Sequence, residues 1–477
     1  MQKKIIALLM SVVLLIGICS MSGCGKSGNK GNAFVVPEGG FNLNEPVEIT
    51  FAHTMNQQLQ GVLDMAIADF NKIYPNITIK HSQYGGWGEI NGQINTEITG
   101  DTQPNIAYCY PDHVAMYNLA KAVVVLDNLI DSDVAVGDTG EIIGLTQAQK
   151  DDFIKAYYDE GKVYGDGMMY TMPLNKSTEA LFYDKDFFEQ HNLKVPTTWD
   201  EMWQVCEQIK KIDPDCYPLG RDSDDNWFIT MCEQMNSGYT STEKGNEYQF
   251  NNAENKAMVK MLRENYQKGY FTTQDIFGKY TSNLFVAPQG QKRCYMCIGS
   301  TGGTKNQLSN INSTDGSFRF EVGVAPIPQV DTNNKKVISQ GPNLCILQGN
   351  KTTDQQILAS WLFVKFLCTD VVFQGSMSMM QGYMPVINSA INNQAYSEWL
   401  NNANGKENLV AAGVKLGMEL AAQDGYYFVS PAFKGSSQAR DEVGELLVKC
   451  LTKEAGSDAE LDAYIDQFFA EAIDNCE

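Results

Sequence analysis

The sequence predicts an α/β protein made of two lobes. Its 477 residues are more than one hydrophobic core normally supports, which favours two or more structural units. Segments with the two-residue period of strands alternate with segments of helical period, and this alternation is typical of α/β folds with largely parallel sheets. An apolar content of 43% and a mean hydropathy of −0.28 are those of an ordinary soluble globular protein.

The N-terminal third contains the clearest alternation of strand and helix patterns. Strands are predicted over 47–51, 77–79 and 105–108, and helices over 59–73 and 89–99. Binding loops of such sheets lie at the carboxyl ends of the strands. We therefore expect ligand contacts in the three segments that follow these strands, at 53–56, 84–87 and 110–113, with His53 and Asn56 as candidates in the first.

The stretch from 170 to 212 predicts a strand followed by an amphipathic helix. An apolar run with an aromatic pair at 181–183 is bounded by polar residues, as expected of a buried strand. Thr198 can cap a helix N-terminus and Glu201 can complete the capping box. Apolar residues then recur at three-to-four spacing up to residue 212, so one face of the helix is expected to be buried.

The remaining patterns complete the α/β prediction. A buried strand is expected at 294–298, a glycine-rich loop at 299–303 and closing helices at 441–451 and 461–473. Cys294 and Cys297 have the spacing of a redox motif, but residues three apart on a strand point to opposite faces. We interpret both as packing residues. The pairing of the ten cysteines other than Cys19 and Cys24 cannot be read from the sequence.

Several passages, taken in order, resemble one protein family. The letters MPLN…LFYDKDFF…VPTTWDEM begin at residue 172, and GDTQPNIAYCYPDHVAMYNLAKAVVVLDNLI begins at residue 100. Together with 321–328 and 382–385, they resemble extracellular solute-binding proteins of the sugar-binding (family 1) type, which include maltose-binding-protein-like chains. Asn105 stands where this family commonly has Asp. The resemblance implies capture of a carbohydrate for an ATP-driven (ABC) importer.

The resemblance also implies a domain organisation. The family has a two-lobe, periplasmic-binding-protein-like fold with a central cleft and three interdomain crossings, here expected near 174–181, 338–346 and 381–387. We expect lobe 1 to comprise 46–176 plus 345–382 and lobe 2 to comprise 177–344 plus 383–477. Residues 24–45, rich in Gly, Asn, Ser and Lys, are expected to be a flexible tether.

Residues 1–23 are interpreted as a signal peptide of lipoprotein type. Two lysines precede an apolar run that ends near residue 19, too short for a confident membrane span. Ser22-Gly23-Cys24 then resembles a lipoprotein processing site, so Cys24 is the expected lipidated N-terminus. The alternative is a plain secretory signal with a chance cysteine. Lipidation would anchor the protein outside the cytoplasmic membrane.

Charge excludes several classes of partner. The formal net charge is −21, which argues against nucleic-acid binding and against docking on an anionic membrane surface. We find no H-E-x-x-H, G-x-S-x-G or P-loop pattern, and no spacing that indicates a metal site. We therefore predict a monomeric binding protein without catalytic residues, cofactor or metal.

Sugar binding predicts aromatic and hydroxyl-binding residues in the cleft. Trp87, after Gly85-Gly86, and Trp227, after an acidic run, are candidates for stacking on a sugar, although each could instead pack under its own loop. Tyr383 and Phe433 lie in segments that border the cleft in the family, but single aromatic residues of this kind are more often core.

Hydroxyl-binding candidates come from both predicted lobes. Asp112 and His113 stand at a strand end where the family places such side chains, and His113 could instead be structural. Ser177 and Glu179 lie at the first crossing, where hinge hydrogen bonding is the alternative. The loop Ser300-Thr301-Gly302 offers hydroxyls and backbone N–H groups, or else forms a tight turn.

Two alternatives to carbohydrate capture stay open. The same fold could bind a sugar phosphate or polyol phosphate, which requires two or more cationic side chains to converge in the cleft. A secreted glycoside hydrolase would instead place two carboxylates across the cleft at catalytic separation. The identity and length of the sugar, and the identity of the permease, cannot be read from the sequence.

Overall fold

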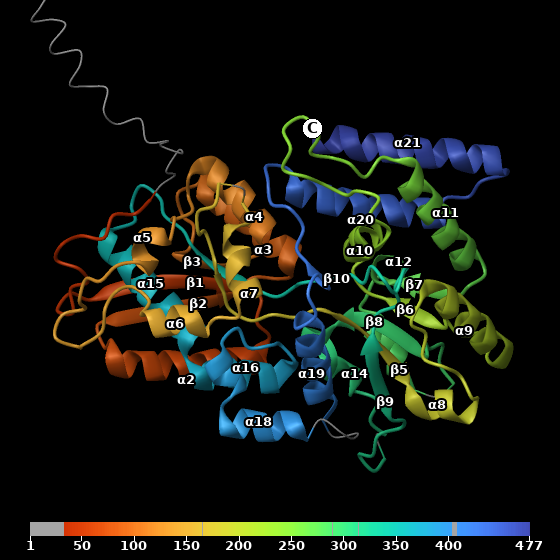
Figure 1. Ribbon diagram of the computed structural model, residues 1–477, viewed down its shortest axis with the longest axis horizontal. Helices are drawn as coiled ribbons and strands as arrows, with labels where there is room; N and C mark the ends of the chain where they lie inside the picture. Colours follow the sequence, from red (N-terminus) through yellow and green to blue (C-terminus); the bar gives the residue numbers. More distant parts are fainter. Residues whose placement is uncertain (1–32, 165, 289, 313, 403–407) are drawn as a thin grey trace, which may run out of the picture.

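The computed structural model describes residues 33–164, 166–288, 290–312, 314–402 and 408–477. The chain forms two α/β lobes that lie side by side, each built around its own sheet (Figure 1). The two-lobe fold predicted from the sequence is confirmed. The predicted signal peptide and Cys24 lie outside the described residues.

The sheet of lobe 1 has five strands in the order β2-β1-β3-β11-β4. The first three strands are parallel, with Val47 opposite Ile77, while β11 runs antiparallel to both β3 and β4. The strands are β1 (Val47–His53), β2 (Ile77–Gln83), β3 (Ile106–Cys109), β4 (Met172–Pro173) and β11 (Asn343–Ile346). The three N-terminal strands predicted by alternation are all present.

Lobe 2 repeats this arrangement with different segments. Its strand order is β7-β6-β8-β5-β9, again with three parallel strands followed by a strand antiparallel to both neighbours. The strands are β5 (Glu179–Asp184), β6 (Leu219–Arg221), β7 (Phe271–Thr273), β8 (Met296–Ser300) and β9 (Val322–Pro326). Each sheet therefore receives one antiparallel strand from the part of the chain that joins the lobes.

Helices cover the faces of both sheets (Figure 1). Those that pack in lobe 1 are α2 (Gln57–Ile73), α3 (Trp87–Thr99), α4 (Pro111–Tyr117), α5 (Asp127–Ile130), α6 (Gln147–Asp152), α7 (Lys155–Asp159), α15 (Asp354–Thr369), α16 (Val371–Gln381), α17 (Asn388–Ile391) and α18 (Gln394–Asn401), with the 3-10 turns η1 (Asn118–Ala120) and η2 (Glu160–Lys162). Those of lobe 2 are α8 (Lys185–Gln190), α9 (Trp199–Ile212), α10 (Asp224–Met235), α11 (Ala253–Gln267), α12 (Gln274–Phe277), α13 (Ser282–Phe285), η3 (Thr301–Gly303), α14 (Thr304–Gln307), α20 (Ser436–Thr452) and α21 (Asp458–Cys476). The remaining helix, α19 (Leu409–Ala421), packs against β9 of lobe 2 and against α16 and α18 of lobe 1.

Helix α9 shows how local sequence places an element. Thr198 accepts a hydrogen bond from the Glu201 backbone N–H at 3.2 Å, and the Glu201 carboxylate accepts one from the Thr198 N–H at 3.3 Å. This reciprocal arrangement satisfies two backbone donors at the helix start. The capping box predicted from the sequence is confirmed, and the apolar face behind it is buried.

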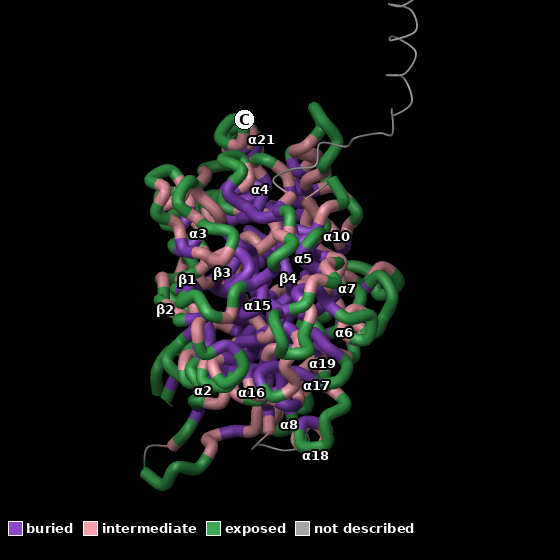
Figure 2. The backbone as a smooth tube through the Cα atoms, turned by 90° about the vertical axis from the view of Figure 1, so that its left-hand side faces the viewer, coloured by how far each residue is buried: buried purple, intermediate pink, exposed green. Residues whose placement is uncertain are grey.

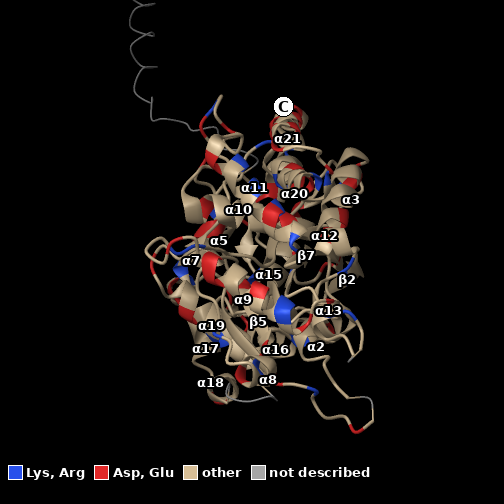
Figure 3. Ribbon diagram, turned by 90° about the vertical axis from the view of Figure 1, so that its right-hand side faces the viewer, with Lys and Arg blue, Asp and Glu red and all other residues tan. Residues whose placement is uncertain are grey.

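Each lobe has its own hydrophobic core. In lobe 1, Phe70 packs edge-on against Phe363, and in lobe 2 Trp227 packs edge-on against Phe271. All four rings are buried, and Figure 2 shows the buried backbone running through the middle of the molecule. On the face in Figure 3, acidic and basic segments are interspersed along the helices, without a continuous basic tract.

The lobes are joined by segments that lie side by side. Lys176 pairs with Met384, and Ser177 exchanges backbone hydrogen bonds with Gln340 at 2.8 and 2.9 Å. Gly341 has a φ of +106°, and a Cβ there would lie 2.4 Å from the Asn175 carbonyl oxygen, so the close approach requires glycine. Beside these segments, β10 (Val337–Ile338) pairs in parallel with β12 (Tyr427–Phe428).

The packing differs from two of the predicted boundaries. Residues 386–396, placed by the sequence in lobe 2, contribute Ile387 and Tyr396 to the core of lobe 1, because α17 and α18 fold back onto α16. The later half of the predicted tether is also packed. Phe41 is only 2% exposed, and its ring contacts Tyr74 with 6.4 Å between centroids, so residues 33–45 lie against lobe 1.

Candidate binding site

A cavity of about 630 Å³ lies between the lobes. Its walls come from the starts of α3 and α4 on lobe 1 and from α10, α12 and α20 on lobe 2. Its floor comes from the joining segments at 176 and 338–341. The volume falls within the range of about 300–1,000 Å³ that small-molecule sites occupy. We define this cavity as the cleft.

The wall of lobe 1 is largely aromatic. Trp87, the first residue of α3, lies against Tyr110, with 4.4 Å between the ring centroids, and is stacked at 11° on Tyr108. Tyr110 is the N-cap residue of α4, so Asp112 and His113 follow in the first turn of that helix. The segments after β2 and β3 thus place these residues on one wall, as predicted for the carboxyl ends of parallel strands.

His113 is a neutral group at this wall. It is only 5% exposed, and its Nδ1 atom has no hydrogen-bond partner within the described ranges. Burial lowers the pKa of His113, whereas the charge of Asp112 raises it by a smaller amount. An imidazole that is neutral at pH 7 can accept or donate one hydrogen bond at the cleft, depending on its tautomer.

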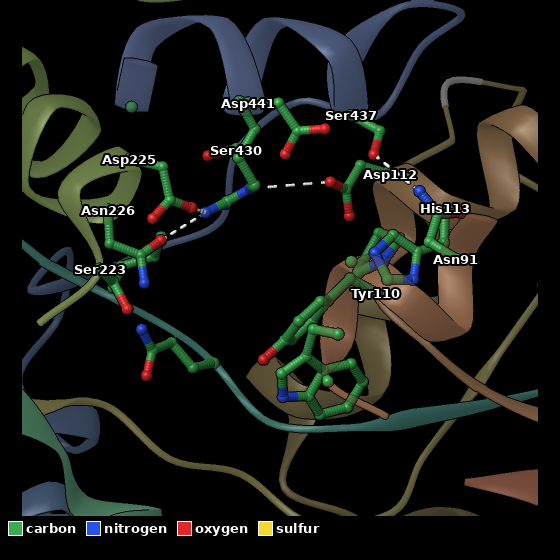
Figure 4. Close-up of a pocket in the computed structure, with 18 of the residues that line it drawn as sticks. Asn91, Tyr110, Asp112, His113, Ser223, Asp225, Asn226, Ser430, Ser437 and Asp441 are labelled. Atoms are coloured by element: carbon green, nitrogen blue, oxygen red, sulfur yellow. Dashed lines mark hydrogen bonds and ion pairs between the residues drawn. The ribbon is translucent and has the colours of Figure 1, made fainter. Parts of the chain in front are cut away.

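The wall of lobe 2 is polar and charged, with Arg440 at its centre. The guanidinium donates hydrogen bonds to Asp225 at 2.7 Å and to Asn226, both on α10. Its Nε atom also lies 3.7 Å from the carboxylate of Asp112 on the opposite lobe. Figure 4 shows Asp225 and Asn226 on one side of the cleft facing Asp112 on the other. Burial would lower the pKa of Arg440, but the two nearby carboxylates raise it, so the side chain stays charged.

Direct contact between the lobes extends beyond this ion pair. Asn91 on α3 donates to the Ser437 hydroxyl on α20 at 3.1 Å (Figure 4). At the other side of the joining segments, Lys305 on α14 donates to Gln58 on α2 at 2.7 Å. Protein groups therefore bridge the lobes at two separate places, one on each side of the joining segments.

The floor of the cleft contains a buried ion pair. Lys176, 1% exposed, pairs with Glu160, 4% exposed, and Ser339 donates to the other carboxylate oxygen of Glu160 at 2.6 Å. These three residues come from η2 and from two of the joining segments. The pair therefore connects the two joining segments to η2 at the hinge between the lobes. The two charges of the pair largely compensate each other.

Several residues predicted to bind ligand do not line the cleft. His53, fully buried, accepts from the Met55 N–H, which directs its Nε2–H towards His81 at 2.9 Å. Asn56 instead caps α2 by accepting from the N–H groups of Gln58 and Leu59. The loop after β1 is therefore used for packing and helix capping, unlike the loops after β2 and β3.

Four further predicted residues have structural positions in lobe 2. Trp227 is fully buried in the lobe 2 core, so we withdraw it as a stacking residue. Glu179 forms a bidentate ion pair with Arg221 at 2.9 and 2.6 Å, both residues being 1% exposed. Ser177 bonds to Gln340 in the hinge, as the alternative interpretation expected. Phe433 packs against Tyr248, with 5.7 Å between ring centroids.

The predicted glycine-rich loop forms a turn at the hinge. Ser300 accepts from the Gly302 N–H at 3.1 Å, and the Thr178 backbone carbonyl accepts from the Thr301 N–H at 2.7 Å. The Tyr383 ring lies so close to Gly302 that a Cβ there would be 2.8 Å from it. This loop and Tyr383 therefore support the joining segments. Of the predicted ligand contacts, Trp87, Asp112 and His113 line the cleft.

Sequence reasoning missed most of the lobe 2 wall. Tyr280, Asp275, Arg440 and Asp441 line the cleft but stand in segments without a recognisable binding pattern. Asp225 lies in the acidic run that precedes Trp227, to which we assigned no ligand contact.

Comparison with known proteins identifies the family. Residues 65–404 match the family described as bacterial extracellular solute-binding protein, a match that covers more than half of the chain. The chain belongs to this family. It is therefore an extracellular solute-binding protein of the type that serves ABC importers, and the family consists of binding proteins and not of enzymes.

Curated relatives and solved structures agree with this assignment. The chain is 23% identical over 355 residues to the sn-glycerol-3-phosphate-binding periplasmic protein UgpB of Salmonella typhimurium, covering 72% of this chain and 75% of the relative. The corresponding protein of Escherichia coli K12 is 24% identical over 362 residues, covering 73% and 76%.

Two solved structures have the same fold. UgpB from Mycobacterium tuberculosis, in complex with glycerophosphocholine, aligns with a TM-score of 0.68 at 17% identity, covering 90% of this chain and 98% of that chain. The GacH receptor of Streptomyces glaucescens, solved unliganded and with acarbose, aligns with a TM-score of 0.66 at 16% identity, covering 90% and 98%. At these identities the likeness concerns the fold.

The described residues contain neither a single membrane-spanning helix nor a cluster of metal ligands. No single helix among them is both long and apolar enough to cross a membrane, and only α15 and α16 satisfy those criteria as a pair, bent by 64°. Within the same residues, no group of three or more His, Cys, Asp or Glu side chains is arranged to hold a metal ion.

Proposed function

We propose that this protein captures a carbohydrate in the cleft and delivers it to an ABC importer. The observation that supports the proposal is the division of chemistry between the two walls. The Trp87 and Tyr110 rings on lobe 1 suit the C–H face of a sugar, and Asp225, Asn226 and Ser430 on lobe 2 suit its hydroxyls. Contacts from both lobes are needed because a ligand closes the lobes only if it binds the closed form better than the open form.

The main alternative is a phosphorylated polyol, which the name of the curated relatives suggests for those proteins. A phosphate needs cationic groups that are free to bind it. The cleft contains Arg440 and Lys176 as its basic residues within the described part of the chain, and both already pair with carboxylates. This pairing favours an uncharged or cationic ligand over an anionic one.

A thermal-shift screen tests the proposal. The mature protein is heated with neutral mono- and oligosaccharides and, in parallel, with sn-glycerol 3-phosphate and inorganic phosphate. A ligand that binds only the folded protein raises the melting temperature by mass action. We expect at least one saccharide, recovered chemically unchanged, to stabilise the protein, and the phosphates to have no effect. Stabilisation by glycerol 3-phosphate alone would replace carbohydrate with a polyol phosphate as the ligand.

We also propose that Cys24 carries a lipid that anchors the protein outside the cytoplasmic membrane. The support is Ser22-Gly23-Cys24 directly after an apolar segment. Replacing Cys24 with Ala should move the protein from the detergent phase to the aqueous phase. Cys19→Ala is the matched control and should leave the partitioning unchanged. Detergent-phase partitioning that survives the Cys24 change would contradict the anchor.

A further inference from the structure

The cleft carries more negative than positive charge. Its acidic residues are Asp112, Glu160, Asp225, Asp275, Asp441 and Glu445, and its basic residues are Lys176 and Arg440. A cleft lined by one sign of charge between low-dielectric walls concentrates ligands of the opposite sign.

Both basic residues of the cleft are compensated. Lys176 pairs with Glu160, and Ser339 completes the environment of that carboxylate. Arg440 bonds to Asp225 at 2.7 Å and lies 3.7 Å from Asp112. Each cation therefore faces at least one carboxylate, and Arg440 faces two.

Two carboxylates of the lobe 2 wall remain uncompensated. Within the described ranges, no ion pair or side-chain hydrogen bond is formed by the carboxylates of Asp275 on α12 and Asp441 on α20. Figure 4 shows Asp441 close to Asp112 across the top of the cleft. Burial, and next the charge of Asp225, raises the pKa of Asp441 to about 6. Arg440 opposes this rise only in part, so negative charge is gathered at this wall in excess of the positive charge that the protein supplies.

Aromatic rings line the same cleft on both lobes. Trp87 and Tyr110 form the lobe 1 wall, and Tyr280 follows α12 on lobe 2 with 59% of its surface exposed. Carboxylates beside aromatic faces recognise ammonium groups, because the ring quadrupole and the negative charges both attract a cation. His113 adds a buried Nδ1 atom without a partner among the described residues on the same lobe 1 wall.

We infer that the ligand is an amine-bearing carbohydrate, whose protonated amine binds between Asp275 and Asp441 while its ring faces Trp87 and Tyr110. The inference rests on the proposed function and specifies its ligand class. A neutral sugar can donate hydroxyl hydrogen bonds to these carboxylates, but it leaves the repulsion that Asp225 exerts on each of them uncompensated as the lobes close and exclude water. A protonated amine supplies both the hydrogen-bond donors and the opposite charge.

The test uses three matched series of disaccharides that differ only at one position, which carries an amine, an N-acetylamine or a hydroxyl. The gluco and galacto forms are each included with β-1,4 and β-1,6 linkages. Affinity is measured by calorimetry on the mature protein at pH 7 and constant ionic strength. For each sugar and linkage that binds, we expect the amine form to bind at least about tenfold more tightly than the hydroxyl form. A charge-assisted hydrogen bond provides a difference of this size.

Isosteric variants locate the effect. Asp275→Asn and Asp441→Asn should each weaken binding of the amine about tenfold and change binding of the hydroxyl sugar by less than about twofold. Glu419→Gln, an exposed carboxylate on α19 outside the cleft, is the control for the loss of one charge and should change neither. Unchanged melting temperatures of the free variants would show that folding is intact.

The outcomes separate this inference from the proposed function. If hydroxyl sugars bind as tightly as their amine counterparts, or if the two variants behave like Glu419→Gln, the amine assignment is overturned and carbohydrate capture stands. If no sugar of any series binds, and none of the wider saccharide screen stabilises the protein, the proposed function fails and the amine assignment with it.

Discussion

The two lobes have the same strand arrangement but different cleft walls. Each sheet has three parallel strands followed by an antiparallel fourth strand, and each is covered by helices. Lobe 1 presents the rings of Trp87 and Tyr110, whereas lobe 2 presents the charges of Asp225, Asp275 and Arg440. A repeated framework therefore supplies two unlike surfaces, because the side chains that reach the cleft come from the loops and helix ends and not from the sheet itself.

The lobes also differ in how they accommodate buried ionisable side chains. In lobe 2, the Glu179–Arg221 pair lies inside the lobe, on strands that flank β8. In lobe 1, a chain of hydrogen bonds runs from His53 through His81 to Asp64, each link 2.9 Å long. The first arrangement depends on a full ion pair, whereas the second contains the buried imidazole of His53, which burial keeps neutral. This contrast predicts different responses to mutation and to pH.

The largest effect is expected from the lobe 2 ion pair. Arg221→Met should lower the free energy of unfolding by about 3–5 kcal/mol, because Glu179 is left buried without its partner. The double variant Arg221→Met with Glu179→Gln should lose clearly less, since it removes both charges. Urea denaturation measures both. Equal losses in the single and double variants would show that packing, and not charge, accounts for the effect.

Lobe 1 should respond to acid through His53. Burial, and next the charge of His81, lowers the pKa of His53 from 6.5 to about 4. The unfolded chain therefore binds a proton that the folded chain does not, so stability is complete above pH 6.5 and is lost as the pH falls towards 4. The loss amounts to about 3 kcal/mol when both states are protonated.

Urea denaturation at several pH values between 7 and 4 measures this loss. His53→Asn should reduce the acid sensitivity, and His191→Asn, on lobe 2 at the end of α8, should keep the wild-type dependence because His53 is intact. Hydrogen exchange at pH 5 should show earlier opening in lobe 1 than in lobe 2. An unchanged pH dependence in His53→Asn would contradict the assignment.

The aromatic wall of lobe 1 should dominate ligand affinity. Trp87→Ala is expected to weaken binding of the cognate sugar by about 2 kcal/mol, or about thirtyfold, as for a stacked anchor residue. Trp203→Ala is the matched control, because Trp203 stacks on Trp199 within lobe 2 away from the cleft. Calorimetry measures both affinities. If the Trp87 variant bound as tightly as the control, the lobe 1 wall would have only a packing role.

The smallest effect is expected at the contact between the lobes. Asp112→Asn removes the charge that lies 3.7 Å from Arg440 while Arg440 keeps its bond to Asp225. Partly exposed ion pairs contribute up to about 1 kcal/mol, so the closed form should lose roughly 0.5–1 kcal/mol. Small-angle scattering of the ligand-free protein should show a larger average radius of gyration. Glu207→Gln, which breaks an exposed pair within α9, should not change it.

Local sequence determined the elements of this protein. The strand and helix patterns, the capping box at Thr198 and the ordered family-like passages predict two α/β lobes and the family. These features follow from nearest neighbours along the chain, where hydrophobic period and capping chemistry act directly. The same reasoning placed Trp87, Asp112 and His113 at strand ends that do face the cleft.

Only the tertiary structure decided which side chains meet. Trp87 and Trp227 are both tryptophans on segments next to polar turns, yet one lines the cleft and the other is fully buried. Asp225 and Arg440, 215 residues apart in sequence, meet because α10 and α20 pack together in lobe 2. Such pairing depends on the path of the chain between the lobes. Sequence periodicity does not record that path, since it describes each segment relative to its own neighbours alone.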